Sequence, residues 1–212
     1  MIKGVVFDFD GTLVDSMKLV FEALNVILRR KGLPEIEAGL LGGMAGLPIR
    51  EIISGKMHLP EDDLREIERD VFGAYLEFCT SSCQLLPSVE NTLKGLKSMG
   101  LKLGVLTTTP RKPLESVVKR FALQGYFDIM LAMEDAKSKP NPDGLEQIIR
   151  EFGINKDECL YVGDSPIDVL TGKAAGVRTI AVTTGITTLE QLKEKAPDAI
   201  ITDLQQLLTY IK

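Results

Sequence analysis

The chain has 212 residues, of which 44% are hydrophobic, and a formal net charge of −5. This length supports one good-sized core with room for a smaller appended domain. No basic face is evident, so we expect no nucleic-acid partner, and no apolar run is long enough to span a bilayer. Three cysteines argue against a disulfide framework and fit a reducing cytoplasm, and a single histidine disfavours His-based triads and most zinc sites.

The chain opens with an apolar run that ends in two carboxylates. The run Gly-Val-Val-Phe at 4–7 predicts a strand buried on both faces, as in a parallel sheet, and Asp8 and Asp10 follow it. Two carboxylates at the end of a buried strand are costly to desolvate unless a cation or a reaction needs them. A solvated turn is the simpler interpretation, but the polar residues that follow later strands favour a functional one.

A helical block without a strand signal covers residues 16–84. Apolar positions at helical spacing predict helices over about 16–31, 48–56 and 60–79, with Ser16 as an N-cap. Residues 39–48 form a glycine-rich, apolar loop. Its glycine spacing does not fit a dinucleotide-binding fingerprint, and no strand leads into it.

From residue 85 strands and helices alternate. Apolar runs predict strands at 102–106, 127–132, 158–162, 178–182 and 199–201. Helices are predicted before the first of these strands, between each of the first four, and at about 203–211. This alternation predicts an α/β fold with a doubly wound, Rossmann-like parallel sheet. We assign residues 1–15 and 85–212 to this core and residues 16–84 to an inserted helical cap over the site.

Polar residues follow several of the predicted strands. Thr107 comes after the second strand, Lys139 lies in the loop after the third, and Asp164 and Asp168 follow the fourth. Ligands of such sheets bind outside the carboxyl ends of the strands, so we expect these residues to meet the two aspartates of the first strand. Four carboxylates need counter-charge, of which the lysine supplies one part. Oxygen ligands without His or Cys favour Mg²⁺ for the rest.

This set of groups suits chemistry on a phosphate ester. A lysine and a threonine hydroxyl beside a cation would complete a phosphate cradle. A free aspartate can attack phosphorus and form an acyl phosphate. A neighbouring aspartate can protonate the leaving oxygen and then activate water.

Four motifs resemble those of the haloacid dehalogenase-like hydrolases, in the same order along the whole chain. The segment Asp-Phe-Asp-Gly-Thr-Leu-Val-Asp at 8–15 is similar to motif I, and Thr107 to motif II. Lys139, in Lys-Pro-Asn-Pro-Asp, is similar to motif III, and Gly-Asp-Ser-Pro-Ile-Asp at 163–168 to motif IV. The subgroup resembled is the phosphoglycolate phosphatase and β-phosphoglucomutase branch, which places a helical cap between motifs I and II.

The resemblance implies a role for each matching residue. Asp8 would be the nucleophile and a magnesium ligand. Asp10 would be the general acid/base and would also ligate the metal through its backbone carbonyl. Asp164 would be a metal ligand, and Asp168 would support the metal site.

The phosphoryl group has its own implied partners. Thr107 and the amide of Thr108 would bind the phosphoryl oxygens, and Lys139 would neutralise the nucleophile and the phosphate. Family members often carry Asn where Thr108 stands. We expect this difference to change a supporting contact rather than the chemistry.

The resemblance implies a magnesium-dependent phosphomonoester hydrolase of a small phosphorylated metabolite, acting through an aspartyl-phosphate. A β-phosphoglucomutase-like mutase is the main alternative, but its group carries a cap histidine where Val20 stands here. A metal-free haloacid dehalogenase would lack Asp10, and a phospho-acceptor signalling module would lack the cap insert. Phosphoglycolate, sugar phosphates, nucleotides and pyrophosphate all stay open as substrates.

Some residues have two interpretations. In the cap, Arg50 and Lys18 are candidates to contact a substrate anion, although solvated surface side chains are equally expected. Asp15 is either a site residue or a helix cap, and Ser165 is more readily an N-cap than a ligand. We expect hinges for the cap near 12–16 and 82–87, and a monomer in the cytoplasm.

Overall fold

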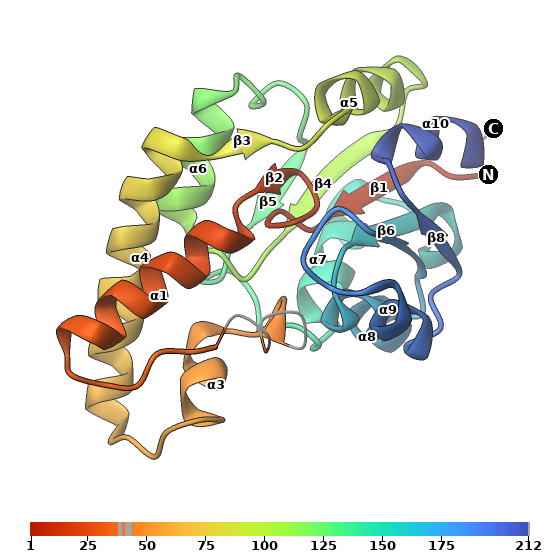
Figure 1. Cartoon of the computed structure of the whole chain (residues 1–212). Coiled ribbons are helices and arrows are strands. Elements are labelled where there is room, and N and C mark those ends of the chain that lie inside the picture. The colour runs from red at the N-terminus through yellow and green to blue at the C-terminus, as the bar shows by residue number, and fades with distance from the viewer. Residues whose placement is uncertain (38–39, 41–43, 212) are drawn as a thin grey trace.

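The computed structural model of the chain describes residues 1–37, 40 and 44–211. Within them, six strands form one sheet in which every neighbouring pair is parallel (Figure 1). Their order across the sheet is β5 (Ile129–Leu131), β4 (Lys102–Leu106), β1 (Gly4–Phe7), β6 (Cys159–Gly163), β7 (Arg178–Val182) and β8 (Ala199–Ile201). The expected α/β fold with a doubly wound parallel sheet is confirmed.

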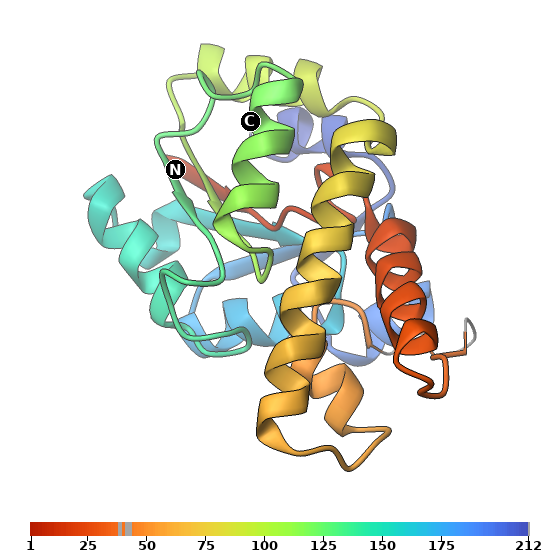
Figure 2. The ribbon, with the colours of Figure 1, turned by 90° about the vertical axis from the view of Figure 1, so that its left-hand side faces the viewer.

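The central strand β1 is buried on both faces, as its apolar run predicts. Successive side chains of a strand point to opposite faces. Val5 and Phe7 join a core with helices on one face, and Val6 joins a separate core on the other. The first face is covered by α5 (Val89–Ser98), α6 (Arg111–Arg120) and α10 (Leu207–Tyr210), and the second by α7 (Asp143–Phe152), α8 (Pro166–Ala175) and α9 (Leu189–Glu194) (Figures 1 and 2).

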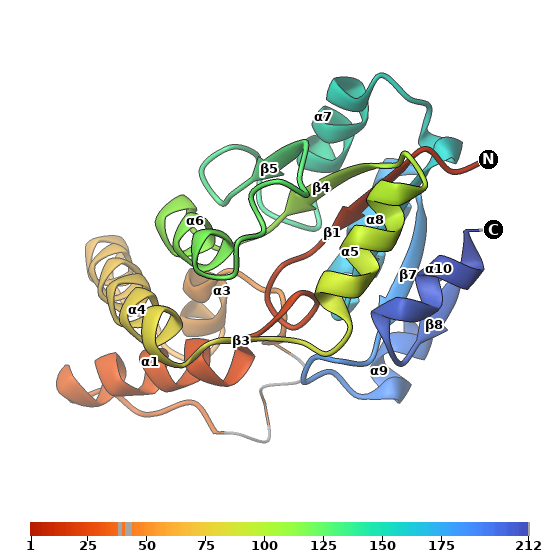
Figure 3. The same cartoon turned by 90° about the horizontal axis from the view of Figure 1, so that it is seen from above.

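Three helices from the N-terminal half stand beside the sheet, near the carboxyl ends of its strands (Figures 2 and 3). They are α1 (Met17–Arg30), α3 (Ile49–Ser54) and α4 (Glu61–Ser82). α4 packs along α1 and also touches α6, where Arg120 Nη1 donates to the carbonyl oxygen of Cys79 at 2.6 Å. In the part of the chain that the structure describes, no helix is both long and apolar enough to cross a membrane.

The chain enters and leaves this helical block through two short strands that pair with each other. β2 (Val14–Asp15) and β3 (Gln84–Leu85) form an antiparallel ribbon. Neither strand was predicted, because a two-residue strand is too short to leave a periodic pattern, and of the two only Gln84 lies within 16–84. The ribbon lies where the hinges are expected, and it supports our proposal to divide the cap from the core at residues 15/16 and 84/85.

Several boundaries differ from those that the sequence predicts. The helix expected at 60–79 runs to Ser82, and the one expected at 203–211 begins as a 3₁₀ turn before α10. α9 was not predicted at all; a Thr188 capping box starts it. Part of the loop expected at 39–48, namely residues 39 and 41–43, lies outside the described residues.

Candidate active site

The sheet order places three of the predicted site residues next to one another. β4, β1 and β6 are neighbours, so Thr107, Asp8 and Asp164, each just beyond the end of its strand, lie at one edge of the sheet. The chain crosses from β1 to β4 on one side and later to β6 on the other. The strand order therefore reverses at β1, and such a reversal is where doubly wound sheets bind ligands.

Lys139 joins two aspartates below this edge. Its Nζ donates to Asp8 Oδ1 and to Asp168 Oδ1, each at 2.7 Å, and all three side chains are buried. Asp168 Oδ1 also accepts from the Tyr161 hydroxyl at 2.8 Å. Asp168 Oδ2 accepts from the Ser165 backbone N–H at 3.1 Å and from its hydroxyl at 2.6 Å. Both oxygens of Asp168 are thus engaged, and this residue fixes Lys139 against Asp8.

Only one of the two carboxylate oxygens of Asp164 accepts a hydrogen bond from the described residues. Oδ1 accepts from Thr12 Oγ1 at 2.9 Å, whereas the buried Oδ2 has no hydrogen-bond partner among the residues that the structure describes. Two glycines leave this oxygen its space: a Cβ would come within 2.5 Å of Oδ2 at Gly11 and within 1.8 Å at Gly185. An unpartnered carboxylate oxygen in a cradle that only glycine permits is suited to a ligand.

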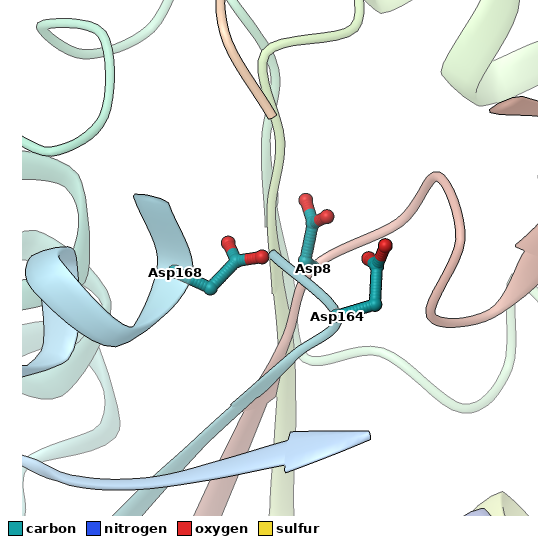
Figure 4. A group of neighbouring side chains, drawn as sticks. All are labelled: Asp8, Asp164 and Asp168. Carbon is teal, nitrogen blue, oxygen red and sulfur yellow. The ribbon is translucent and has the colours of Figure 1, made fainter. Parts of the chain in front are cut away.

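Three carboxylates gather at this point (Figure 4). One oxygen each from Asp8, Asp164 and Asp168 lies within 4.8 Å of the others. In Figure 4 the carboxylates of Asp8 and Asp164 point to the same side, and Asp168 reaches toward Asp8 from α8. Asp168, expected to support the site, is thus next to the two expected carboxylate ligands. The side chain of Asp10 is not part of the cluster, and the ligand expected from Asp10 is its backbone carbonyl.

The electrostatics of the cluster are unbalanced. Burial raises the pKa of Asp8 to about 7, with a further rise from Asp168 that the charge of Lys139 opposes. Burial and the charges of Asp8 and Asp168 also raise the pKa of Asp164 well above its usual range. Burial by itself would lower the pKa of Lys139, but the charges of Asp168 and Asp8 outweigh it and the pKa rises. When all three carboxylates are ionised, the single ammonium leaves two negative charges, which a divalent cation would match. The residues present therefore fit a bound metal ion.

Asp10 is held by three hydroxyl groups. Ser16 and Tyr75 donate to its Oδ1, and Thr109 donates to its Oδ2. Ser16 is the N-cap residue of α1, as expected, but its side chain makes no cap hydrogen bond and its hydroxyl donates to Asp10 instead. Tyr75 comes from α4 in the helical block and is fully buried. A residue of the block thus touches the predicted acid/base directly.

Neither Tyr75 nor Thr109 was predicted as a site residue. Tyr75 belongs to the apolar stripe of a helix 65 positions away from its partner, and no local pattern separates it from the core residues around it. Thr109 lies two residues after Thr107 at the same strand end. The run of three threonines at 107–109 could have indicated that Thr109 also belongs to the site.

The threonines that follow β4 lie beside the aspartates that follow β1, as expected. The Thr109 N–H donates to Thr107 Oγ1 at 3.0 Å, which fixes the turn after β4. Thr107 is buried next to the loop that carries Lys139, and the partly exposed Thr108 lines the same cavity as Asp8 and Asp10. Both threonines are thus next to the predicted nucleophile.

A cavity opens above the carboxylates, between the sheet edge and the helical block. Asp8, Asp10 and Thr108 line its floor, and apolar residues of α1, α3 and α4 line the rest. It holds about 40 Å³, roughly the space of three waters. Gly46, in the loop before α3, borders this cavity and approaches the core: its φ is +78°, and a Cβ there would meet Ser165 Oγ at 2.6 Å.

The four residues that have two interpretations from the sequence do not line this cavity. Arg50 forms ion pairs with Glu61 at 2.7 Å and with Glu68 at 3.0 Å, and it borders a neighbouring hollow. The structure therefore does not bring Arg50 to the carboxylates. Its contact with a substrate stays a prediction. Lys18 and Asp15 are exposed. Ser165 is the N-cap of α8, with a capping box to Asp168, as expected.

Comparison with known proteins assigns the family. The family model of haloacid dehalogenase-like hydrolases matches residues 5–182. This chain belongs to that family. The resemblance to this family and the expectation of a hydrolytic enzyme are thereby confirmed.

Named relatives and solved structures agree with this assignment. A phosphoglycolate phosphatase of Photorhabdus laumondii is 32% identical over 99% of this chain and 92% of its own length. A protein of Caldanaerobacter subterraneus, provisionally named pyrophosphatase PpaX, is 30% identical over 100% and 95%. The crystal structure of a Bacteroides fragilis protein, provisionally described as a haloacid dehalogenase-like hydrolase, has a TM-score of 0.90 at 29% identity, over 98% of this chain and 100% of that one. The resemblance to the phosphoglycolate phosphatase branch is confirmed.

Proposed function

We propose that this chain is a magnesium-dependent phosphatase that hydrolyses the monoester of a small metabolite through an aspartyl-phosphate on Asp8. The observation that carries this proposal is the position of Asp8. It lies at the strand-order reversal, is held by Lys139, and faces a cavity that it shares with Asp10. Relatives named as phosphatases support the same reaction class.

The first step is attack of an Asp8 carboxylate oxygen on phosphorus. The bond between phosphorus and the ester oxygen breaks, its electron pair goes to that oxygen, and Asp10 donates a proton to it. In the second step Asp10 takes a proton from water as the water oxygen attacks the acyl phosphate. Inorganic phosphate leaves, and Asp8 is restored as a carboxylate.

The remaining polar groups hold the phosphoryl group during both steps. The hydroxyl of Thr107 and the N–H of Thr108 would donate to its oxygens, and Lys139 would balance the charge that Asp8 shares with it. Lys139 is kept in place by Asp168, which is in turn saturated by Tyr161 and Ser165. Positioning of this kind supplies much of the rate acceleration in phosphoryl transfer.

Asp8 and Asp164, with the backbone carbonyl of Asp10, would hold the metal ion. When bound, Mg²⁺ would offset the charge of the carboxylates and of the phosphoryl oxygens. The free Oδ2 of Asp164, its glycine cradle and the all-oxygen donor set support this part of the proposal.

The mutase alternative is less well supported. Val20, which stands where that group carries a cap histidine, lines the cavity beside Asp10. An aliphatic side chain there offers neither a proton nor a hydrogen bond that would delay water. Conversion of β-glucose 1-phosphate to glucose 6-phosphate without release of phosphate would favour the mutase.

The test is phosphate release from p-nitrophenyl phosphate by the whole chain. We expect turnover with Mg²⁺, none in EDTA, and recovery when Mg²⁺ is added back. Ca²⁺ should restore little, because its looser and higher coordination would misplace the attacking carboxylate. Full activity in EDTA would contradict the magnesium proposal, and no turnover with Mg²⁺ would contradict the phosphatase.

We also propose that the chain acts as a monomer in the cytoplasm on a small metabolite, without nucleic acid. The three cysteines are free and buried, which suits a reducing compartment. Size-exclusion chromatography with light scattering would test the monomer, for which a mass of 23.3 kDa is expected.

A further inference from the structure

The cavity above Asp8 has a polar floor and an apolar wall. Asp8, Asp10, Thr108, Thr109 and the hydroxyl of Tyr75 provide the polar side-chain groups, and all of them lie at the end where the phosphate would bind. The wall above is made by Val20, Phe21, Met44, Leu47, Ile52 and Phe72, among other apolar residues. In this reaction the organic group of the ester must occupy that upper part, since Asp10 faces the ester oxygen.

Few polar groups in the cavity are free to meet that organic group. The hydroxyls of Tyr75 and Thr109 both donate to Asp10. Among the described residues that line the cavity, this leaves Thr108 as the polar side chain without an assigned partner near the phosphate. A sugar or other polyhydroxylated group would lose its hydrogen bonds to water there and gain few in return.

No cation lines the described cavity. Lys139 lies behind Asp8, between two carboxylates. Arg50 is paired with Glu61 and Glu68 in the neighbouring hollow, and Lys18 is exposed on α1. The residues at 38–39 and 41–43 are Ala, Gly, Leu, Gly and Gly, none of which has an ionisable side chain.

We propose that the substrate is a phosphomonoester whose organic group is uncharged and mainly apolar. This proposal rests on the phosphatase function and names its substrate class. A carboxylate or a second phosphate on the organic group would be buried against aliphatic and aromatic side chains, beside Asp8 and Asp10, without a counter-charge. An unpaired charge in such a place is strongly unfavourable. Phosphoglycolate and pyrophosphate, which the names of two relatives suggest, are therefore expected to be poor substrates.

The test compares two esters of equal size. Isobutyl phosphate and phosphoglycolate have the same number of heavy atoms, and they differ in whether the organic group ends in two methyls or a carboxylate. We expect kcat/KM for isobutyl phosphate to exceed that for phosphoglycolate on the order of 100-fold. Inorganic pyrophosphate should be as poor as phosphoglycolate.

Binding gives a readout that does not depend on turnover. The phosphonates in which a CH₂ replaces the ester oxygen are 3-methylbutylphosphonate and 3-phosphonopropionate. With the magnesium-loaded chain in a calorimeter, we expect the first to bind more tightly by a similar factor.

A cation placed in the wall should reverse part of the preference. Val20 is only partly buried and lies on the cavity wall of α1. In Val20→Lys the ratio of kcat/KM should shift toward phosphoglycolate by about fivefold. Val20→Met, of similar length but uncharged, should leave the ratio as it is.

The outcomes separate the two proposals. Equal or better turnover of phosphoglycolate or pyrophosphate would overturn the apolar substrate class and leave the phosphatase intact. A selective rise of the phosphoglycolate KM in Arg50→Ala would do the same, because it would show that Arg50 reaches the substrate. If no ester is hydrolysed, including p-nitrophenyl phosphate, the phosphatase proposal falls and this inference falls with it.

Discussion

At the scale of single residues, Tyr75 links the helical block to the chemistry. Its hydroxyl donates to Asp10 Oδ1 although the two residues come from different parts of the fold. A buried hydrogen bond to a carboxylate contributes about 1.5–3 kcal/mol. This bond therefore helps to fix the orientation of the Asp10 carboxyl, from which the leaving oxygen would receive its proton.

Tyr75→Phe removes that hydroxyl and leaves the ring. We expect kcat/KM for phenyl phosphate to fall about tenfold. The fall for p-nitrophenyl phosphate should be smaller, because its leaving group is a stable anion and needs little protonation. The measurement is the ratio of kcat/KM for these two esters of similar shape.

Tyr161→Phe is the matched control. Its hydroxyl donates to Asp168 rather than to Asp10, so both esters should lose activity by the same factor. If Tyr75→Phe also affects both esters equally, Tyr75 supports the fold and does not position Asp10.

The residues predicted from sequence and those that were missed differ in how they are held. Asp8 and Asp164 each follow a buried strand within a recognisable motif, so position in the chain predicts position in space. Ser16 and Tyr75 reach Asp10 only through the packing of helices against the sheet. No local pattern records that packing, and hence their roles could not be predicted.

At the scale of elements, the loop before α3 closes the cavity onto the core. Gly46 lies against Ser165, the N-cap of α8, in a backbone conformation that favours glycine. The helical block also meets the core at the β2–β3 ribbon, along α6, and through the bond from Tyr75 to Asp10. We expect the block to move on this ribbon to admit the ester and then to exclude water.

Gly46→Ala tests whether closure needs this contact. The new methyl would come within 2.6 Å of Ser165 Oγ, so it should hold the block away from the core. We expect kcat/KM to fall at least about tenfold, because the closed site excludes water and completes the cavity wall. The strain of a left-handed alanine should reduce stability by about 1 kcal/mol.

Gly32→Ala carries the same strain without the clash. Gly32 ends α1 with φ +69°, and a Cβ there would meet nothing within 4 Å. It should match Gly46→Ala in lost stability while keeping the activity of the unaltered chain. Equal activities in the two variants would show that closure does not depend on Gly46.

The elements themselves could be predicted to different degrees. β1, β4 and β6 are continuous apolar runs and lie where the sequence predicts them. β2 and β3 have two residues each, and α9 has six, so none has a period to detect. The order of the strands in the sheet could not be predicted from the hydrophobic pattern either, because it depends on which strands pair when the chain folds.

At the scale of the whole molecule, the cluster of carboxylates should link stability to pH and to the metal. The pKa of Asp8 rises from 3.8 to about 7 in the metal-free fold, chiefly by burial and by the charge of Asp168. Between about pH 4 and pH 7 the folded protein therefore holds a proton that the unfolded chain has released. Stability of the metal-free protein should fall as pH rises through this window.

Magnesium should reverse this trend, because it binds the ionised carboxylates. We expect the rise in Tm on adding Mg²⁺ to be larger at about pH 8 than at about pH 5. Thermal unfolding at both pH values, with Mg²⁺ or EDTA, measures it. The effect should shrink in Asp8→Asn, and a rise in Tm that is equal at both pH values would contradict the linkage.

The most direct measurement of the central claim compares the chain with its Asp8→Asn variant for phosphate release in the presence of Mg²⁺. The amide has the shape of the carboxylate but is not a nucleophile, so the variant should keep the fold, as circular dichroism would verify. We predict that phosphate release falls at least about 1000-fold. A variant that stays folded and retains activity within tenfold of the unaltered chain would contradict the assignment of Asp8 as the residue that accepts the phosphoryl group.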